Sequence, residues 1–109
     1  MMTALKTEEV RYTGIKHIEE WLYSNGFINI FNNTEETGIN SIAADGNIEH
    51  ILVLVKTLLR SGMPDKLEDD FKTELKENAT RLGRKAYIAY LVIDSDKNLL
   101  GEINWERLS

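Results

Sequence analysis

Cysteine is absent from this 109-residue chain, and proline occurs once. Without cysteine there is no disulfide and no thiolate metal site, so packing alone has to stabilise the fold. Long hydrophobic runs are missing as well. Runs such as Ile51 to Val55 are far too short to cross a bilayer, and the first residues, MMTALKTEEV, lack the apolar stretch of a signal peptide. These absences predict a cytoplasmic protein with no membrane segment.

Positive charge is in deficit, with 13 Lys and Arg residues against 18 Asp and Glu residues and a net charge of −5. Nucleic-acid affinity rests largely on the neutralisation of phosphates, which this balance opposes. The basic residues are also interleaved with acids, as in EDDFKTELKENATRLGRK, and form no block. The charge therefore disfavours a nucleic-acid partner, and we expect a protein partner or self-association.

The overall composition, 42% hydrophobic and 28% charged, is typical of a globular domain. The length of the chain fits one hydrophobic core. We therefore expect a single domain over residues 1–109. Periodicity and turn residues predict the order α-β-β-β-α-β-β, hence an α/β or α+β fold. The predicted elements are helices at 7–23 and 65–82 and strands at 27–31, 39–44, 48–56, 86–93 and 99–105. The apolar run ILVLV predicts that the third strand is central in its sheet, and Asp45-Gly46-Asn47 predicts a hairpin turn before it.

This element order, with GINSIAADG at 38–46 and ILVLVKT at 51–57, resembles the PD-(D/E)xK nuclease superfamily. The similarity is greatest to archaeal Holliday-junction resolvases and to small predicted bacterial endonucleases related to them, and it covers residues 12–93. It implies a restriction-endonuclease-like core, in which helices flank a central mixed sheet. In that superfamily the second strand carries an aspartate in a G-x-D-x-I-A pattern, the third strand carries E-x-K, and the first helix carries an early glutamate.

The acidic positions of that motif are all changed in this chain. Asn40 stands at the aspartate position and Leu54 at the glutamate of E-x-K, while the glutamate of the first helix corresponds to Ile15. Only the lysine, Lys56, is retained. The hairpin predicts that residue 40 lies opposite or diagonal to residue 54, with residue 56 on the same face as residue 54. Leu54 and Ile15 are most simply core residues that fill the former metal pocket.

Without those acids a divalent metal site is not expected. Mg²⁺ needs hard oxygen ligands, and each carboxylate about 4 Å from a unit charge contributes roughly 4 kcal/mol at an effective dielectric near 20. Lys56 alone would repel the ion. Other acids could substitute, and the alternative is a relocated site of Glu19, Glu36 and Lys56 that binds Mg²⁺ or Mn²⁺.

The sequence thus leads to three hypotheses. The first is a catalytically inactive domain with a nuclease-like core, which acts as a structural or protein-interaction module, with a homodimer as one form of that interaction, and needs no cofactor. The second is a divergent metal-dependent nuclease that uses the relocated acids. The third is a nucleic-acid-binding module without catalysis, which needs a basic surface that the linear sequence does not show.

Overall fold

The computed structural model describes residues 7–32, 41–60 and 69–108. Within them the chain forms two helices and five strands in the predicted order. The helices are α1 (Thr7–Ser24) and α3 (Asp69–Arg81); the strands are β1 (Ile28–Asn32), β2 (Ser41–Asp45), β3 (His50–Leu59), β4 (Lys85–Ile93) and β5 (Leu99–Arg107). Neither described helix is both long and apolar enough to span a membrane.

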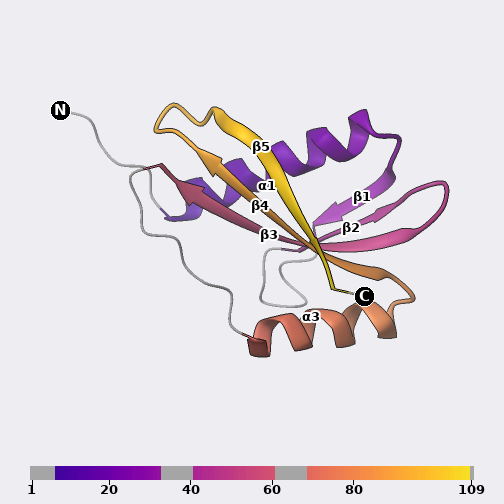
Figure 1. The fold of residues 1–109 in the computed structure, drawn as a ribbon. Coiled ribbons are helices and arrows are strands. Elements are labelled where there is room, and N and C mark those ends of the chain that lie inside the picture. Colours follow the sequence, from indigo (N-terminus) through magenta and orange to yellow (C-terminus); the bar gives the residue numbers. More distant parts are fainter. Residues whose placement is uncertain (1–6, 33–40, 61–68, 109) are drawn as a thin grey trace.

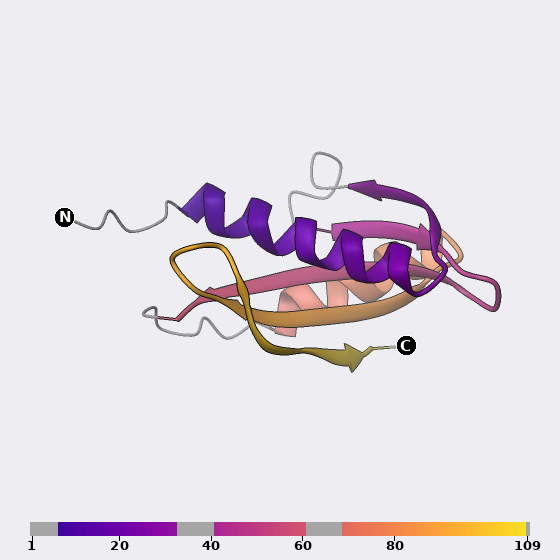
Figure 2. The same ribbon diagram turned by 90° about the horizontal axis from the view of Figure 1, so that it is seen from above.

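The five strands form one mixed sheet in the order β1-β2-β3-β4-β5. Strands β3 and β4 are parallel, and the other three neighbouring pairs are antiparallel. The two helices lie on opposite faces of this sheet, α1 on one side and α3 on the other (Figures 1 and 2). The chain is therefore an α+β protein with a five-stranded mixed sheet, and the prediction that the third strand is central is confirmed.

Two hydrophobic cores fill the spaces between the layers. The core under α1 gathers residues of that helix and of β2, β3 and β4; its buried members are Ile15, Ile18, Leu22, Ile42, Ala44, Ile51, Val53, Val55, Ala89 and Leu91. The core under α3 is smaller; its buried members are Ala43, Leu52, Leu54, Leu75, Ala79, Ala86 and Ile88. Strand β3 contributes side chains to both cores alternately, because successive side chains of a strand point to opposite faces.

Strand β3 ends later than the sequence predicted, at Leu59 instead of Lys56. The parallel ladder with β4 continues without interruption from Ile51 paired with Lys85 to Leu59 paired with Ile93. Each added pair satisfies backbone donors and acceptors, so the strand persists as far as its neighbour does. Hydrophobic pattern alone did not show this, because the neighbour is more than thirty residues away in sequence.

Helix α1 packs onto β3 through a close approach at Gly14. A Cβ on Gly14 would collide with the Oγ1 of Thr57 and would lie 2.7 Å from its Cβ. The Thr57 Oγ1 is itself buried, and it has no hydrogen-bond partner among the described residues. The absence of a side chain at Gly14 thus sets the distance between the helix and the central strand.

We expect Gly14→Ala to lower the free energy of unfolding by about 1–3 kcal/mol, because overpacking outweighs the better helix propensity of alanine. Urea denaturation followed by circular dichroism measures the loss. Glu20→Ala, at an exposed position of the same helix, is the matched control. The double variant with Thr57→Ala should recover part of the loss, because it removes the nearest atom. Wild-type stability in Gly14→Ala would contradict this packing.

Candidate functional site

The retained lysine lies on the α3 face of the sheet. Leu52 and Leu54 point into the core under α3, and Lys56 follows on the same side of β3 by strand alternation. Thr57, the next residue, contacts α1 on the other face, which agrees with this alternation. Lys56 is half-buried. The predicted shared face of residues 54 and 56 is therefore observed.

Ile15 and Leu54 are both core residues, as predicted. Their exposed fractions are 5% and 3%. They belong to different cores, however: Ile15 packs under α1 and Leu54 under α3. The sheet stands between them, so the structure does not bring these two members of the family site together. Asn40, the third changed position, lies outside the described residues.

The sequence predicted a hairpin register in which residue 40 lies opposite or diagonal to residue 54, and the observed register is offset by one residue from the direct pairing. Leu54 lies opposite Ser41, and Asp45 lies opposite His50. The cause is the loop, which consists of the four residues 46–49 and is closed by a hydrogen bond from the Gly46 amide to the Glu49 carbonyl, 3.0 Å long. A turn centred on Gly46 would be shorter. The residue that faces Leu54 across the hairpin is thus a buried serine.

The relocated site of Glu19, Glu36 and Lys56 is not assembled by the residues that can be located. Glu19 is a half-buried residue of α1, whereas Lys56 is directed to the opposite face of the sheet. Glu36 lies outside the described residues. Within the described part of the chain, no group of three or more His, Asp or Glu side chains is placed to hold a metal ion.

The carboxylate on the face of Lys56 is one that the sequence reasoning missed. Lys56 lies next to Tyr90 in the β3–β4 ladder, and the Tyr90 hydroxyl donates to Glu106 Oε2 over 3.3 Å. Lys72 of α3 approaches Glu106 Oε1 at 3.4 Å. Burial, followed by the charge of Glu106, raises the pKa of Tyr90. Strand parity in the β4–β5 hairpin was the available signal, but it could be used only once the register was known.

A second polar cluster surrounds Asp45 at the end of β2. Its Oδ1 accepts hydrogen bonds from His50 Nδ1 at 2.8 Å and from Arg84 Nη1 at 2.9 Å, and its Oδ2 accepts one from Asn29 at 3.1 Å. The same Arg84 Nη1 also donates to the Ala44 carbonyl at 3.1 Å. These bonds join the first three strands to the segment between α3 and β4. The cluster is thus a structural clamp, and sequence patterns did not reveal it because Arg84 is 39 residues from Asp45.

The clamp makes the carboxyl group of Asp45 strongly acidic. Hydrogen bonds from Asn29, His50 and Arg84, in this order of importance, lower its pKa from the ordinary value of 3.8 to about 2. Folding therefore favours the ionised form. The contribution of the clamp to stability is complete above the unfolded pKa and is lost as the pH falls from about 4 toward 2.

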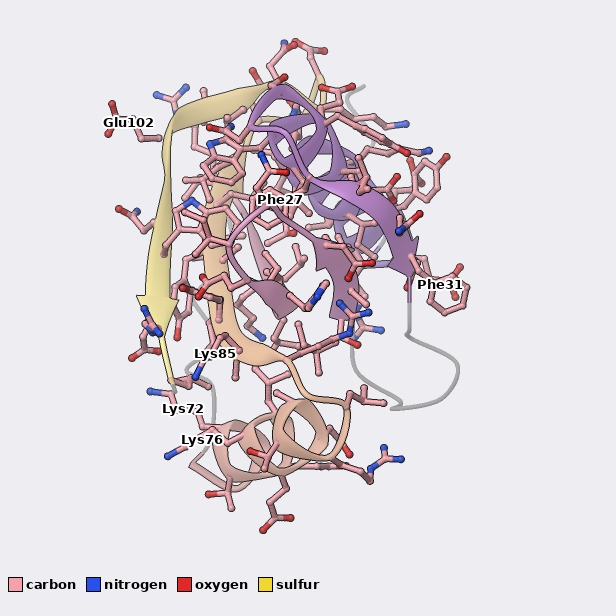
Figure 3. The ribbon with its side chains drawn as sticks, turned by 90° about the vertical axis from the view of Figure 1, so that its right-hand side faces the viewer. Phe27, Phe31, Lys72, Lys76, Lys85 and Glu102 are labelled. Carbon is pink, nitrogen blue, oxygen red and sulfur yellow. The ribbon has the colours of Figure 1, made fainter. Side chains whose placement is uncertain are left out.

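Three lysine side chains lie near one another where α3 meets the start of β4 and the end of β5. Figure 3 shows Lys72, Lys76 and Lys85 on the same side of the molecule. Glu106 compensates part of this charge through its contact with Lys72. On a chain with a net charge of −5, these three lysines are the observation that keeps nucleic-acid binding as an alternative.

Comparison of the sequence with protein-family models and with curated proteins gave no match in either case. The candidate site therefore rests on the residues and contacts described above.

We expect Asp45→Asn to destabilise the protein at neutral pH, because Arg84 and His50 then lose their charged acceptor. The stability difference from wild type should shrink as the pH falls from about 4 toward 2, where the wild-type carboxylate takes up its proton. Urea denaturation at a series of pH values measures this difference. Asp96→Asn, in the exposed β4–β5 turn, is the matched control. A stability difference that does not change with pH would contradict the role assigned to the carboxylate.

Proposed function

We propose that this chain is a catalytically inactive domain with a restriction-endonuclease-like core, and that it acts by binding another protein, here a second copy of itself. The burial of Leu54 carries the first half of the proposal. This residue stands where E-x-K would supply a metal ligand, and it is 3% exposed in a core of aliphatic side chains.

The architecture supports the proposed core. The resemblance implies the order α-β-β-β-α-β-β and a mixed sheet flanked by helices, and both features are present. The central position of β3 also matters, because the superfamily carries E-x-K on its third strand, and Lys56 lies on β3. Fold alone does not give function, so the chemistry of the site has to be argued separately.

The chemistry argues against metal-dependent cleavage. A metal ion beside Leu54 would meet hydrocarbon on the α3 side, where Leu75 and Ala79 of the helix are fully buried. Among the described residues, the side chain opposite Leu54 is the neutral hydroxyl of Ser41, and no group of three or more His, Asp or Glu side chains is placed to replace the water that Mg²⁺ must give up. Burying the leucine itself stabilises the fold by roughly 1.5–3 kcal/mol. Packing and metal binding are therefore alternatives at this position, and the residues present favour packing.

We expect Leu54→Glu, which restores the motif acid, to lower the free energy of unfolding by about 3 kcal/mol or more, because it buries an unpaired charge. Leu54→Met, which conserves volume, should cost less than about 1.5 kcal/mol. Thermal denaturation with and without Mn²⁺ measures both. If Leu54→Glu were as stable as wild type and gained stability with Mn²⁺, position 54 would line an open metal pocket and the proposal would fail.

The edge of the sheet at β1 supports the second half of the proposal. Among the described residues β1 pairs only with β2, and it exposes 61% of Ile28 and 60% of Phe31. Figure 3 shows the Phe31 ring directed away from the body of the molecule. Large apolar side chains on a sheet edge favour association with another surface.

The form of this edge indicates contact through side chains. Asn29 has a left-handed backbone with φ of 51°, and the β1–β2 register is irregular between Ile28 and Phe31. Such a bulge bends an edge strand and hinders a long ladder between two copies. We therefore assign the association to Ile28 and Phe31, which would pack against the same residues of a second copy across a twofold axis.

We expect Phe31→Ser to weaken self-association about tenfold, because the loss of a central aromatic contact costs on the order of 1–2 kcal/mol. Sedimentation velocity over a range of concentrations measures the equilibrium. Ile48→Ser is the matched control, because Ile48 is 97% exposed but belongs to the loop of the β2–β3 hairpin and not to β1. A wild-type chain that stays monomeric at all concentrations, or an equal effect of both variants, would refute this interface.

A further inference from the structure

A pocket on the α1 face of the sheet has no part in the proposed function. Its volume is about 190 Å³. The lining comes from helix, strands and loops, and consists of Trp21, Phe27, Glu49, Ile51, Tyr87 and Trp105. We refer to it as the aromatic pocket. Four of its six lining residues are aromatic, and one is a carboxylate.

The aromatic rings are set at steep angles to one another. The ring centroids of Trp21 and Trp105 are 4.7 Å apart, with 48° between the ring planes. The Tyr87 ring is 6.4 Å from that of Trp105 and stands almost perpendicular to it, at 86°. Rings in this arrangement form a corner instead of a flat stack. The negative faces of aromatic rings in such a corner attract a positive charge.

Glu49 adds a full negative charge to the pocket. Its Oε1 accepts a hydrogen bond of 2.6 Å from the Tyr87 hydroxyl, which fixes the carboxylate beside the rings. This hydrogen bond, together with burial, raises the pKa of Tyr87. The carboxylate remains about one-third exposed, so a ligand can approach it from solvent.

One cation already occupies the rim of the pocket. The guanidinium carbon of Arg107 is 5.8 Å from the centroid of the Tyr87 ring, and its Nη2 is 4.0 Å from Glu49 Oε2. The Arg107 side chain is 55% exposed, and an ion pair at this distance and exposure is weak. The same ring and carboxylate that attract this arginine would attract an external cation.

We propose that the aromatic pocket binds a methylated ammonium group. The rings and Glu49 provide the attraction for a positive charge, and the small volume suits a head group rather than a larger molecule. A primary ammonium needs partners for three N–H donors, and the lining offers one side-chain carboxylate already engaged by Tyr87. A methylated ammonium has fewer such donors or none, and its methyl groups pack against the rings.

This inference goes beyond the proposed function and does not depend on it. The pocket lies under α1, and its residues differ from Ile28 and Phe31 of the β1 edge and from Leu54 and Lys56. Loss of self-association therefore leaves the pocket intact, and a failure of the ligand test leaves the proposed function standing.

Tryptophan fluorescence provides a direct test, because both tryptophans of the chain line the pocket. The intact protein is titrated with tetramethylammonium at constant ionic strength, and 3,3-dimethylbutanol serves as the uncharged analogue of choline. We expect a saturable change with the cation and binding roughly tenfold weaker for the neutral analogue. No saturable change, or equal affinity for both compounds, would overturn the proposal.

Two variants should change the affinity for tetramethylammonium in opposite directions. Glu49→Gln should weaken binding of tetramethylammonium about fivefold or more, because it removes the charge beside the rings. Arg107→Gln should tighten it about threefold, because it removes the competing cation. Glu102→Gln makes the same change of charge as Glu49→Gln at an exposed residue that points away from the sheet (Figure 3), and it should leave affinity within about twofold.

The variants also define what would contradict the assignment. Near-ultraviolet circular dichroism checks that Glu49→Gln keeps its aromatic environment, and Arg107→Gln retains every lining residue if Glu49→Gln does not fold. Equal weakening by Glu49→Gln and Glu102→Gln, or weaker binding by Arg107→Gln, would overturn the proposal.

Parallel titrations identify the source of the head group. Choline represents a free solute, and a short peptide with one trimethyllysine represents a modified protein, with the unmethylated peptide as its control. Tighter binding of the peptide than of choline assigns the pocket to a protein side chain, and the reverse assigns it to a small solute. Equal binding of the methylated and unmethylated peptides would contradict the choice of a methylated cation.

Discussion

The burial of β3 on both faces is the constraint on which the rest of the structure depends. Each residue from Ile51 to Val55 lies in one of two cores, and the alternation of the strand decides which one. A carboxylate at Leu54 would have to enter the aliphatic core under α3. The same strand in an active nuclease would need room for an acid and a metal at this point. Packing of Leu54 in the core under α3 is therefore the observation on which the proposed absence of metal chemistry rests.

In the described parts of the chain, two groups of charged side chains connect secondary-structure elements, and a third lies at a pocket. Asp45, His50 and Arg84 fasten the end of the β2–β3 hairpin to the segment after α3. Glu106 connects Tyr90 of the sheet with Lys72 of α3. Glu49 stands apart from these groups, because it combines a carboxylate with aromatic rings at a pocket open to solvent. A structural role explains the first two groups, whereas the geometry around Glu49 also suits recognition of a cation.

The sequence predicted the order of elements because hydrophobic period and turn residues are local signals. The run ILVLV was sufficient to place β3 at the centre of the sheet, and burial of Ile15 and Leu54 followed from their chemistry. The hairpin register was wrong by one residue, since the Asp-Gly-Asn signal does not state the length of the loop. Local signals also could not show that α1 and Leu54 lie on opposite faces, or that Arg84 reaches Asp45, because both facts depend on contacts between distant segments.

Absence of nuclease chemistry is the central claim, and a cleavage assay tests it most directly. Plasmid, linear and branched DNA are incubated with the intact chain and Mg²⁺ or Mn²⁺, beside Lys56→Ala purified in the same way. The account predicts that neither protein cleaves any substrate above the level of a buffer control. Metal-dependent cleavage by the wild-type chain that disappears in Lys56→Ala would contradict it, and would mean that acids at positions other than 15, 40 and 54 complete an active site around this lysine.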